Sequence, residues 1–96
     1  MTNKEVVINF LNGTNAHSLN MRSENGRLYS YSTCIAETIK REGQKPILIV
    51  NKTKYSSTTS GKHQRPLYDN MSPIKYDIRE ISGVPQGTYS LTRYLK

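Results

Sequence analysis

The sequence predicts an α+β fold: a small single domain, residues 1–96, mostly antiparallel sheet with one or two short helices. Three observations support this class. Asn25-Gly26 separates two segments that alternate like strands, Ile47 to Val50 is a short apolar run, and Ile74 to Ile81 alternates apolar with charged residues. These patterns are typical of a hairpin turn, a buried strand and a strand with one apolar face.

The segment at residues 3–12 allows two interpretations. Thr2 to Glu5 matches a capping box ahead of apolar residues at helical spacing, which favours a helix. The β-branched run Val6 to Ile8 favours a strand instead. Residues 34–41 are open in the same way, because they can extend the preceding strand or form a short helix.

A hairpin over residues 18–33 is the clearest local prediction. The Asn-Gly pair at its centre favours a type I′ turn, because both central residues of that turn need positive φ. Leu19 and Met21 are expected to share one face of the first strand. Tyr29 and Tyr31 are expected to share one face of the second strand.

The chain after the predicted strand at Ile47 to Lys52 is polar and contains two breakers, Gly61 and Pro66. Proline removes a helical hydrogen bond, so a helix capped by Ser60 is expected to last only a turn or two. The next residues, from Leu67 to Pro73, are expected to form a loop.

The content of Leu, Ile, Val and Phe lies close to the ~20% below which disorder becomes common. Seven tyrosines add apolar ring surface to the core. We therefore expect a folded domain with a thin core, which a homodimer would supplement.

The net charge of +7 is unevenly distributed. The stretch between Gly43 and Tyr68 has no acidic residue, and its basic residues are Lys45, Lys52, Lys54, Lys62 and Arg65. A local excess of this kind is typical of a surface that binds nucleic acid, or an acidic protein surface that mimics it. A cationic face that only aids solubility is the competing interpretation.

The polar segment after the predicted core strand is the candidate binding site. Basic side chains attract phosphates, hydroxyl and amide groups donate to phosphate oxygens, and a tyrosine can stack on a base. The residues expected to contact a partner or nucleic acid are Lys52, Lys54, Tyr55, Thr58, Thr59, Ser60, Lys62, His63, Gln64 and Arg65. Alternatively, the Ser/Thr run serves only an extended or capping backbone.

Motifs for catalysis and for cofactors are absent from the sequence. Neither GxxxxGK[ST] nor GxGxxG occurs, and His17 and His63 lie far apart. We expect no catalytic residues, no cofactor and no metal ion. The single cysteine, Cys34, cannot form an internal disulfide, and a buried structural thiol is favoured over a nucleophile paired with His63. With no signal-peptide pattern or apolar run of ~20 residues, a cytoplasmic protein is expected.

Several blocks, read in order, resemble a group of short uncharacterised proteins carried by bacteriophages and other mobile elements. The blocks are Phe10-Leu11-Asn12-Gly13, Ser30-Tyr31-Ser32-Thr33 with Ile35-Ala36, Asn51-Lys52-Thr53-Lys54-Tyr55-Ser56, and Thr58-Thr59-Ser60 with His63-Gln64. They span roughly the first two thirds of the chain. The spacing departs from the group at Gly61, and the group carries no catalytic assignment.

The resemblance implies a protein that acts by binding. Together with the small size and the basic segment, it leads to the hypothesis of a non-enzymatic inhibitor of a host nucleic-acid-directed defence in the bacterial cytoplasm. Such a protein is similar to an anti-CRISPR protein, which blocks a Cas effector or its nucleic acid; another host defence nucleoprotein is the alternative partner. The alternative is a DNA- or RNA-binding accessory protein of the mobile element, which needs no Cas protein. A small nuclease is the third hypothesis and requires strand cleavage that is lost on His63→Ala.

Overall fold

A computed structural model describes residues 1–95, apart from the side chain of Ser60. Six strands form one sheet whose spatial order follows the sequence. They are β1 (Ala16–His17), β2 (Met21–Glu24), β3 (Arg27–Ser30), β4 (Thr33–Ile39), β5 (Ile47–Asn51) and β6 (Asp77–Ile81). Neighbouring strands are antiparallel except β5 and β6, which are parallel. The predicted α+β class with a mostly antiparallel sheet is confirmed.

The undecided segment at the N-terminus forms a helix, α1 (Asn3–Leu11). The predicted capping box is present: the Thr2 hydroxyl accepts from the backbone N–H of Glu5 at 3.1 Å, and the Glu5 carboxylate accepts from the N–H of Thr2 at 2.9 Å. Val6, Val7 and Phe10 are buried on one side. Capping and this buried stripe outweigh the β-preference of the branched residues.

The second undecided segment, at residues 34–41, neither extends the preceding strand nor forms a helix: the chain turns at residues 31–32, and most of the segment belongs to β4, a separate central strand antiparallel to β3. β4 pairs with both β3 and β5, and it contains a bulge. Leu28 faces Ala36 whereas the next residue, Tyr29, faces Cys34, so Ile35 is the extra residue. The bulge places Ile35 and Ala36 in one apolar cluster and Cys34 in the other.

The predicted hairpin is confirmed as β2 and β3. Its turn has φ of 52° at Asn25 and 80° at Gly26, as a type I′ turn requires. The expectation for Leu19 was wrong, because its side chain precedes β2 and is 96% exposed. Tyr31 also does not continue the face of Tyr29: it follows β3 with a positive φ of 53° and is exposed.

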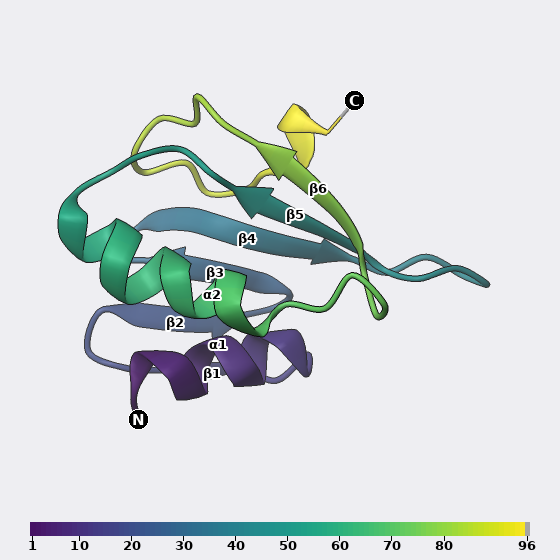
Figure 1. The fold of residues 1–96 in the computed structure, drawn as a ribbon, viewed down its shortest axis with the longest axis horizontal. Coiled ribbons are helices and arrows are strands. Elements are labelled where there is room, and N and C mark those ends of the chain that lie inside the picture. The colour runs from purple at the N-terminus through teal and green to yellow at the C-terminus, as the bar shows by residue number, and fades with distance from the viewer. Residues whose placement is uncertain (96) are drawn as a thin grey trace.

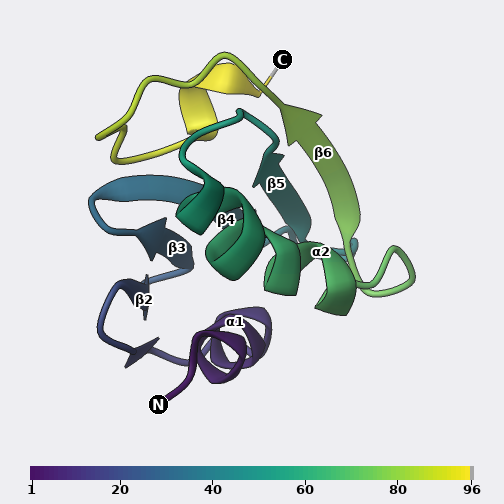
Figure 2. The ribbon, with the colours of Figure 1, turned by 60° about the vertical axis from the view of Figure 1, so that its left-hand side comes forward.

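The sheet is covered on both faces, by different kinds of structure. The two helices α1 and α2 lie side by side on one face. The chain after β6, residues 82–95, crosses the other face and is called the C-terminal segment below (Figures 1 and 2). The cluster under the helices includes Val6, Val7, Phe10, Met21, Leu28, Leu48, Val50 and Leu67. The cluster under the C-terminal segment consists of Tyr29, Cys34, Ile47, Ile49, Val84 and Leu91, with four partly buried residues around it.

The chain after β5 forms a longer helix than predicted. A π-helical segment, η1 (Thr59–Gln64), continues directly into α2 (Arg65–Asn70), so the helix passes through Pro66 and the predicted loop begins only at Met71. In a regular α-helix the Pro66 ring would meet the carbonyl of Lys62, whose hydrogen bond it also removes. The wider turns of η1 lie just before Pro66 and leave more room for its ring. The side-chain amide of Asn3 in α1 donates to the Lys62 carbonyl at 3.3 Å and replaces the hydrogen bond that proline removes.

Candidate binding surface

The segment from Lys52 to Arg65, called the cationic segment below, follows directly on Asn51. This residue is fully buried at the end of β5, and its side-chain amide donates to the carbonyl of Cys34 at 3.2 Å and to the Tyr55 hydroxyl at 2.9 Å. Its side-chain oxygen accepts from the N–H of Thr53 at 3.0 Å. The polar segment therefore leaves the sheet with its direction set by buried hydrogen bonds.

Gln64 closes the segment from the other end. Its side-chain amide is buried and donates to the carbonyls of Asn51 and Thr53 at 2.8 and 3.1 Å. These bonds join the last residue of η1 to the last residue of β5 and to Thr53 just after it. The cationic segment is consequently a closed loop-and-helix unit, with both ends fixed to the same point of the sheet.

His63 lies beneath this unit and is fully buried. Its Nδ1 is 2.5 Å from the hydroxyl of Ser30 on β3, and its ring is 5.4 Å from the ring of Tyr31. Its Nε2 is the one buried side-chain polar atom without a partner among the described residues. Burial lowers the pKa of His63, and the charge of Lys62 lowers it further. The imidazole is therefore held neutral near pH 7.

Thr59 belongs to the same buried polar group. Its hydroxyl lies 3.3 Å from the hydroxyls of both Ser30 and Ser56, and the Ser56 hydroxyl also accepts from the N–H of Thr59 at 3.3 Å. Ser56 thus caps the beginning of the helix. The cap is therefore Ser56, and the prediction of Ser60 was wrong, because the helix begins before Ser60. Thr59 has a packing role within the helix.

The four cations of the cationic segment are exposed but differ in their partners. Lys52 lies 3.5 Å from Glu80 and its ammonium stacks over the Tyr68 ring at 4.3 Å, while Arg65 lies 3.9 Å from Asp69. Within residues 1–95 neither Lys54 nor Lys62 has a carboxylate within the 4.0 Å of an ion pair. These two lysines carry the uncompensated charge of the segment.

The structure thus divides the ten predicted contact residues. Lys52, Lys54, Lys62 and Arg65 are exposed, Tyr55 and Thr58 are partly buried, and Thr59, His63 and Gln64 are buried; the Ser60 side chain lies outside the described part. Tyr55 donates from its hydroxyl to the carbonyl of Val84 at 2.6 Å, so only its ring is available to a partner. The three buried residues fix the backbone of the segment, and the exposed cations project from that backbone.

A hollow of about 290 Å³ beside the cationic segment was not predicted. Each residue of its lining carries a hydroxyl or an amide group: Ser30, Tyr31, Ser32, Thr33, Tyr55, Ser56, Thr59 and Gln86. Part of the lining comes from the Ser30 to Thr33 block, which carried the resemblance. That block was the one sequence feature that pointed to this hollow. Its position next to Tyr55 could not be predicted, because it depends on the pairing of segments that are distant in sequence.

Groups that would support other chemistry are placed as follows. Within the described residues no three His, Cys, Asp or Glu side chains gather as metal ligands. Cys34 is buried, and burial raises the pKa of its thiol to about 12, which keeps it protonated and unreactive. Among the described residues, no helix has the length and apolarity needed to cross a membrane.

No family model, no curated protein and no solved structure matched this chain when it was compared with each.

Proposed function

We propose that this protein acts by binding, through the cationic segment, to a host defence effector or to the nucleic acid at its site, as an anti-CRISPR-like inhibitor carried by a phage or another mobile element. The observation that carries the proposal is the presentation of Lys54, Lys62 and Arg65 on a backbone fixed by the buried side chains of Asn51 and Gln64. A surface ordered before binding loses little entropy on association.

The distribution of ion pairs supports the choice of this surface. Arg22, Arg27, Arg41, Arg65 and Arg79 each lie within ion-pairing distance of a carboxylate. The charge that gives the chain its net +7 is therefore left mostly on lysines, and Lys54 and Lys62 are two of them on one ordered unit. Lysines in this state are suited to phosphates or to an acidic surface that mimics them.

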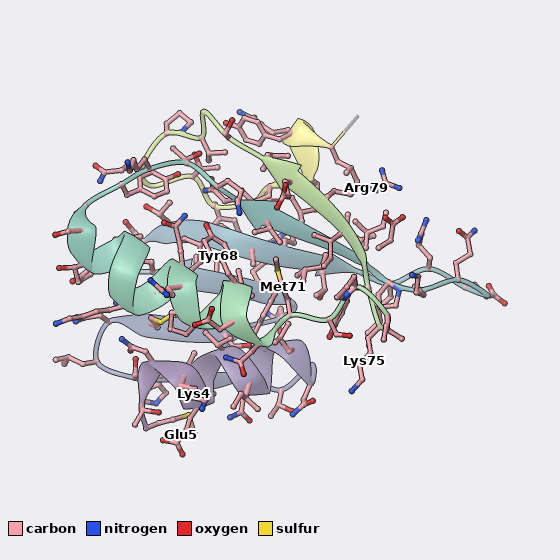
Figure 3. The ribbon with its side chains drawn as sticks, in the orientation of Figure 1. Lys4, Glu5, Tyr68, Met71, Lys75 and Arg79 are labelled. Carbon is pink, nitrogen blue, oxygen red and sulfur yellow. The ribbon has the colours of Figure 1, made fainter. Side chains whose placement is uncertain are left out.

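The test is charge reversal with a matched control. The double variant Lys54→Glu/Lys62→Glu should lose inhibition of a Cas effector's cleavage, and its complex with the effector should no longer co-elute. The control Lys4→Glu/Lys40→Glu has the same net charge; Lys4 lies on the outer side of α1 (Figure 3) and Lys40 is exposed at the end of β4. Full inhibition by the first variant would contradict this surface.

The hollow beside Tyr55 favours a second candidate, an accessory protein that binds DNA or RNA of the mobile element directly. Its hydroxyl groups and the exposed ring of Tyr31 can accept a phosphate and a stacked base. Fluorescence anisotropy with single- and double-stranded DNA and RNA should then show binding that weakens with salt. Loss of two phosphate contacts in Lys54→Glu/Lys62→Glu should flatten the duplex salt dependence by about two units of slope.

The nuclease hypothesis has less support. A general base must reach the proton that it removes, directly or through one water molecule. His63 is fully buried under Tyr31 and is bonded to Ser30. Strand cleavage by the purified protein that disappears in His63→Ala would favour this third function over binding.

A further inference from the structure

The outer edge of β6 has backbone groups that no strand of the described chain pairs with. β6 pairs with β5 on its inner side only. Asp77 donates its N–H to the β5 side at 3.0 Å, and the carbonyl of Ile81 accepts from that side at 2.7 Å. In a parallel pair, alternate residues direct both backbone groups to the same side, so Ile78 and Glu80 direct theirs outward.

This edge is accessible. A hollow of about 540 Å³ is lined by the four consecutive residues from Ile78 to Ile81, together with Tyr94 and Leu95. Successive side chains of a strand point to opposite faces of a sheet, so a hollow touched by all four runs along the rim. Figure 3 shows Arg79 at this rim, with its guanidinium directed away from β5.

We propose that the outer edge of β6 pairs with β6 of a second copy of this chain, antiparallel and about a two-fold axis at Ile78. In this register Ile78 faces Ile78 of the second copy, and their outward N–H and C=O groups exchange two hydrogen bonds. Asp77 faces Arg79 of the second copy, and Arg79 faces its Asp77. An isologous contact of this kind needs a strand that is complementary to itself. β6 meets this condition, because Asp77 and Arg79 lie at equal distances from Ile78 along the strand and carry opposite charges.

Neighbouring symmetric registers are unfavourable. A two-fold axis perpendicular to the sheet lies midway between one residue and the same residue of the second copy, so these two residues face each other. An axis at Arg79 places two arginines opposite each other, and an axis at Asp77 or Glu80 places two carboxylates opposite each other. Like charges directly opposite destabilise a pair of strands, and opposite charges stabilise it. Only the axis at Ile78 combines an apolar pair with two ion pairs.

Charged residues on an edge strand also occur where a protein prevents pairing. Within one chain Arg79 already donates to the Asp77 carboxylate at 3.0 and 2.8 Å. In the paired edge two such ion pairs lie beside each other in opposite orientation, so each charge also faces its opposite on the second copy, which favours pairing over protection. The two-fold axis keeps each face continuous across the joined sheets, so both copies carry their helices and cationic segments on the same side. The short strand predicts a weak dimer, at the small end of interfaces, below about 1,200 Å².

The first experiment is sedimentation equilibrium of the full chain from micromolar to millimolar concentration. The average mass should rise toward twice the mass of one chain. Ile78→Lys places two ammonium groups at the axis and should weaken association at least ten-fold. Ile74→Lys controls for the added charge alone, because Ile74 is 84% exposed and precedes β6, and it should associate like the unmodified protein. Ile78 also packs against the cluster under the helices, so its variant needs a separate test of folding. Thermal melts check that Ile78→Lys remains folded.

The second experiment tests the register by complementation. Asp77→Arg leaves two arginines on the edge and Arg79→Asp leaves two aspartates, so each variant alone should be monomeric. An equimolar mixture should regain a dimer containing one copy of each, which also shows that both variants fold. A chain that stays monomeric at all concentrations overturns the proposal. So does a dimer that Ile78→Lys leaves intact, or a mixture that does not associate.

Discussion

The two faces of the sheet each bury an ionisable side chain, but they treat it in opposite ways. Under the C-terminal segment, Glu37 of β4 has a partner for each carboxylate oxygen: Arg27 at 3.2 Å on one, and the Ser90 hydroxyl and the Leu91 N–H at 2.9 and 2.8 Å on the other. Under the helices, His63 has one partner at Nδ1 and none at Nε2. The face under the C-terminal segment thus holds the carboxylate of Glu37 with hydrogen bonds to both oxygens, and the face under the helices holds the neutral imidazole of His63.

The difference follows from what each face must hold in place. α1 and α2 satisfy most of their own backbone groups and contribute large apolar side chains, so packing attaches them. The C-terminal segment has little regular structure, only the short helix η2 (Thr92–Tyr94). Its backbone needs external acceptors, and the carboxylate of Glu37 is one. Cation–π contact of Arg27 with the Tyr89 ring, at 4.8 Å, adds to the same attachment.

The largest predicted change in the free energy of unfolding is at Glu37, on the face under the C-terminal segment. Glu37→Ala should lower the free energy of unfolding by about 3 kcal/mol, because it removes a buried charge pair and leaves the Leu91 N–H without its acceptor. The Arg27 side chain is 28% exposed and can turn toward water, which keeps the loss at the low end for such pairs. Urea denaturation measures it. Glu37→Gln retains an acceptor oxygen and should lower the free energy of unfolding clearly less than Glu37→Ala. Equal losses would show that the negative charge, and not the acceptor oxygen that Gln retains, accounts for the stabilisation.

A smaller effect is expected on the neutral side. Ser30→Ala removes the hydroxyl that lies between His63 and Thr59, and should cost about 1 kcal/mol of unfolding free energy. Ser90→Ala is the matched control on the other face, since Glu37 retains its bonds to Arg27 and Leu91 there. Ser90→Ala should cost less than Ser30→Ala in the same denaturation experiment. The reverse order would mean that the His63 network contributes little.

The pH dependence of stability should come from the helix-covered face. The pKa of His63 is lowered in the folded state, so the unfolded chain binds its proton more readily. The contribution to stability is therefore present above the ordinary histidine value of about 6.5 and is lost as the pH falls through and below it. Thermal melts between pH 7.5 and about 5 should show this decline. His63→Gln should reduce it, whereas the control His17→Gln, at an exposed position, should not.

The smallest effect is a local one at Cys34, which lies under the C-terminal segment. Its thiol should react with a disulfide reagent only slowly, because it is buried and its pKa is raised to about 12. Glu37→Gln should speed this reaction by loosening the segment, while Ser30→Ala should not. If both variants react equally fast, opening is global and the two faces are not held separately.

Local patterns predicted several elements well. The Asn25-Gly26 turn and the apolar strand at Ile47 depend on residues adjacent in sequence, and both are confirmed. The helix through Pro66 was predicted wrongly because its compensating hydrogen bond comes from Asn3, at the far end of the chain. In the candidate site, exposure of Lys54 and Lys62 followed from their charge. Burial of Thr59, His63 and Gln64 did not, because polar residues in a polar run are usually exposed.

By itself, therefore, the sequence determined the fold class, the hairpin, the core strand and the basic character of the chain between Gly43 and Tyr68, because each depends on local spacing or on composition. Only the tertiary structure decided between helix and strand at residues 3–12 and 34–41, and which members of the polar run hold the backbone and which face solvent. It also decided the open edge at β6. These outcomes depend on contacts between segments that are distant in sequence, where packing and hydrogen-bond satisfaction outweigh local propensity.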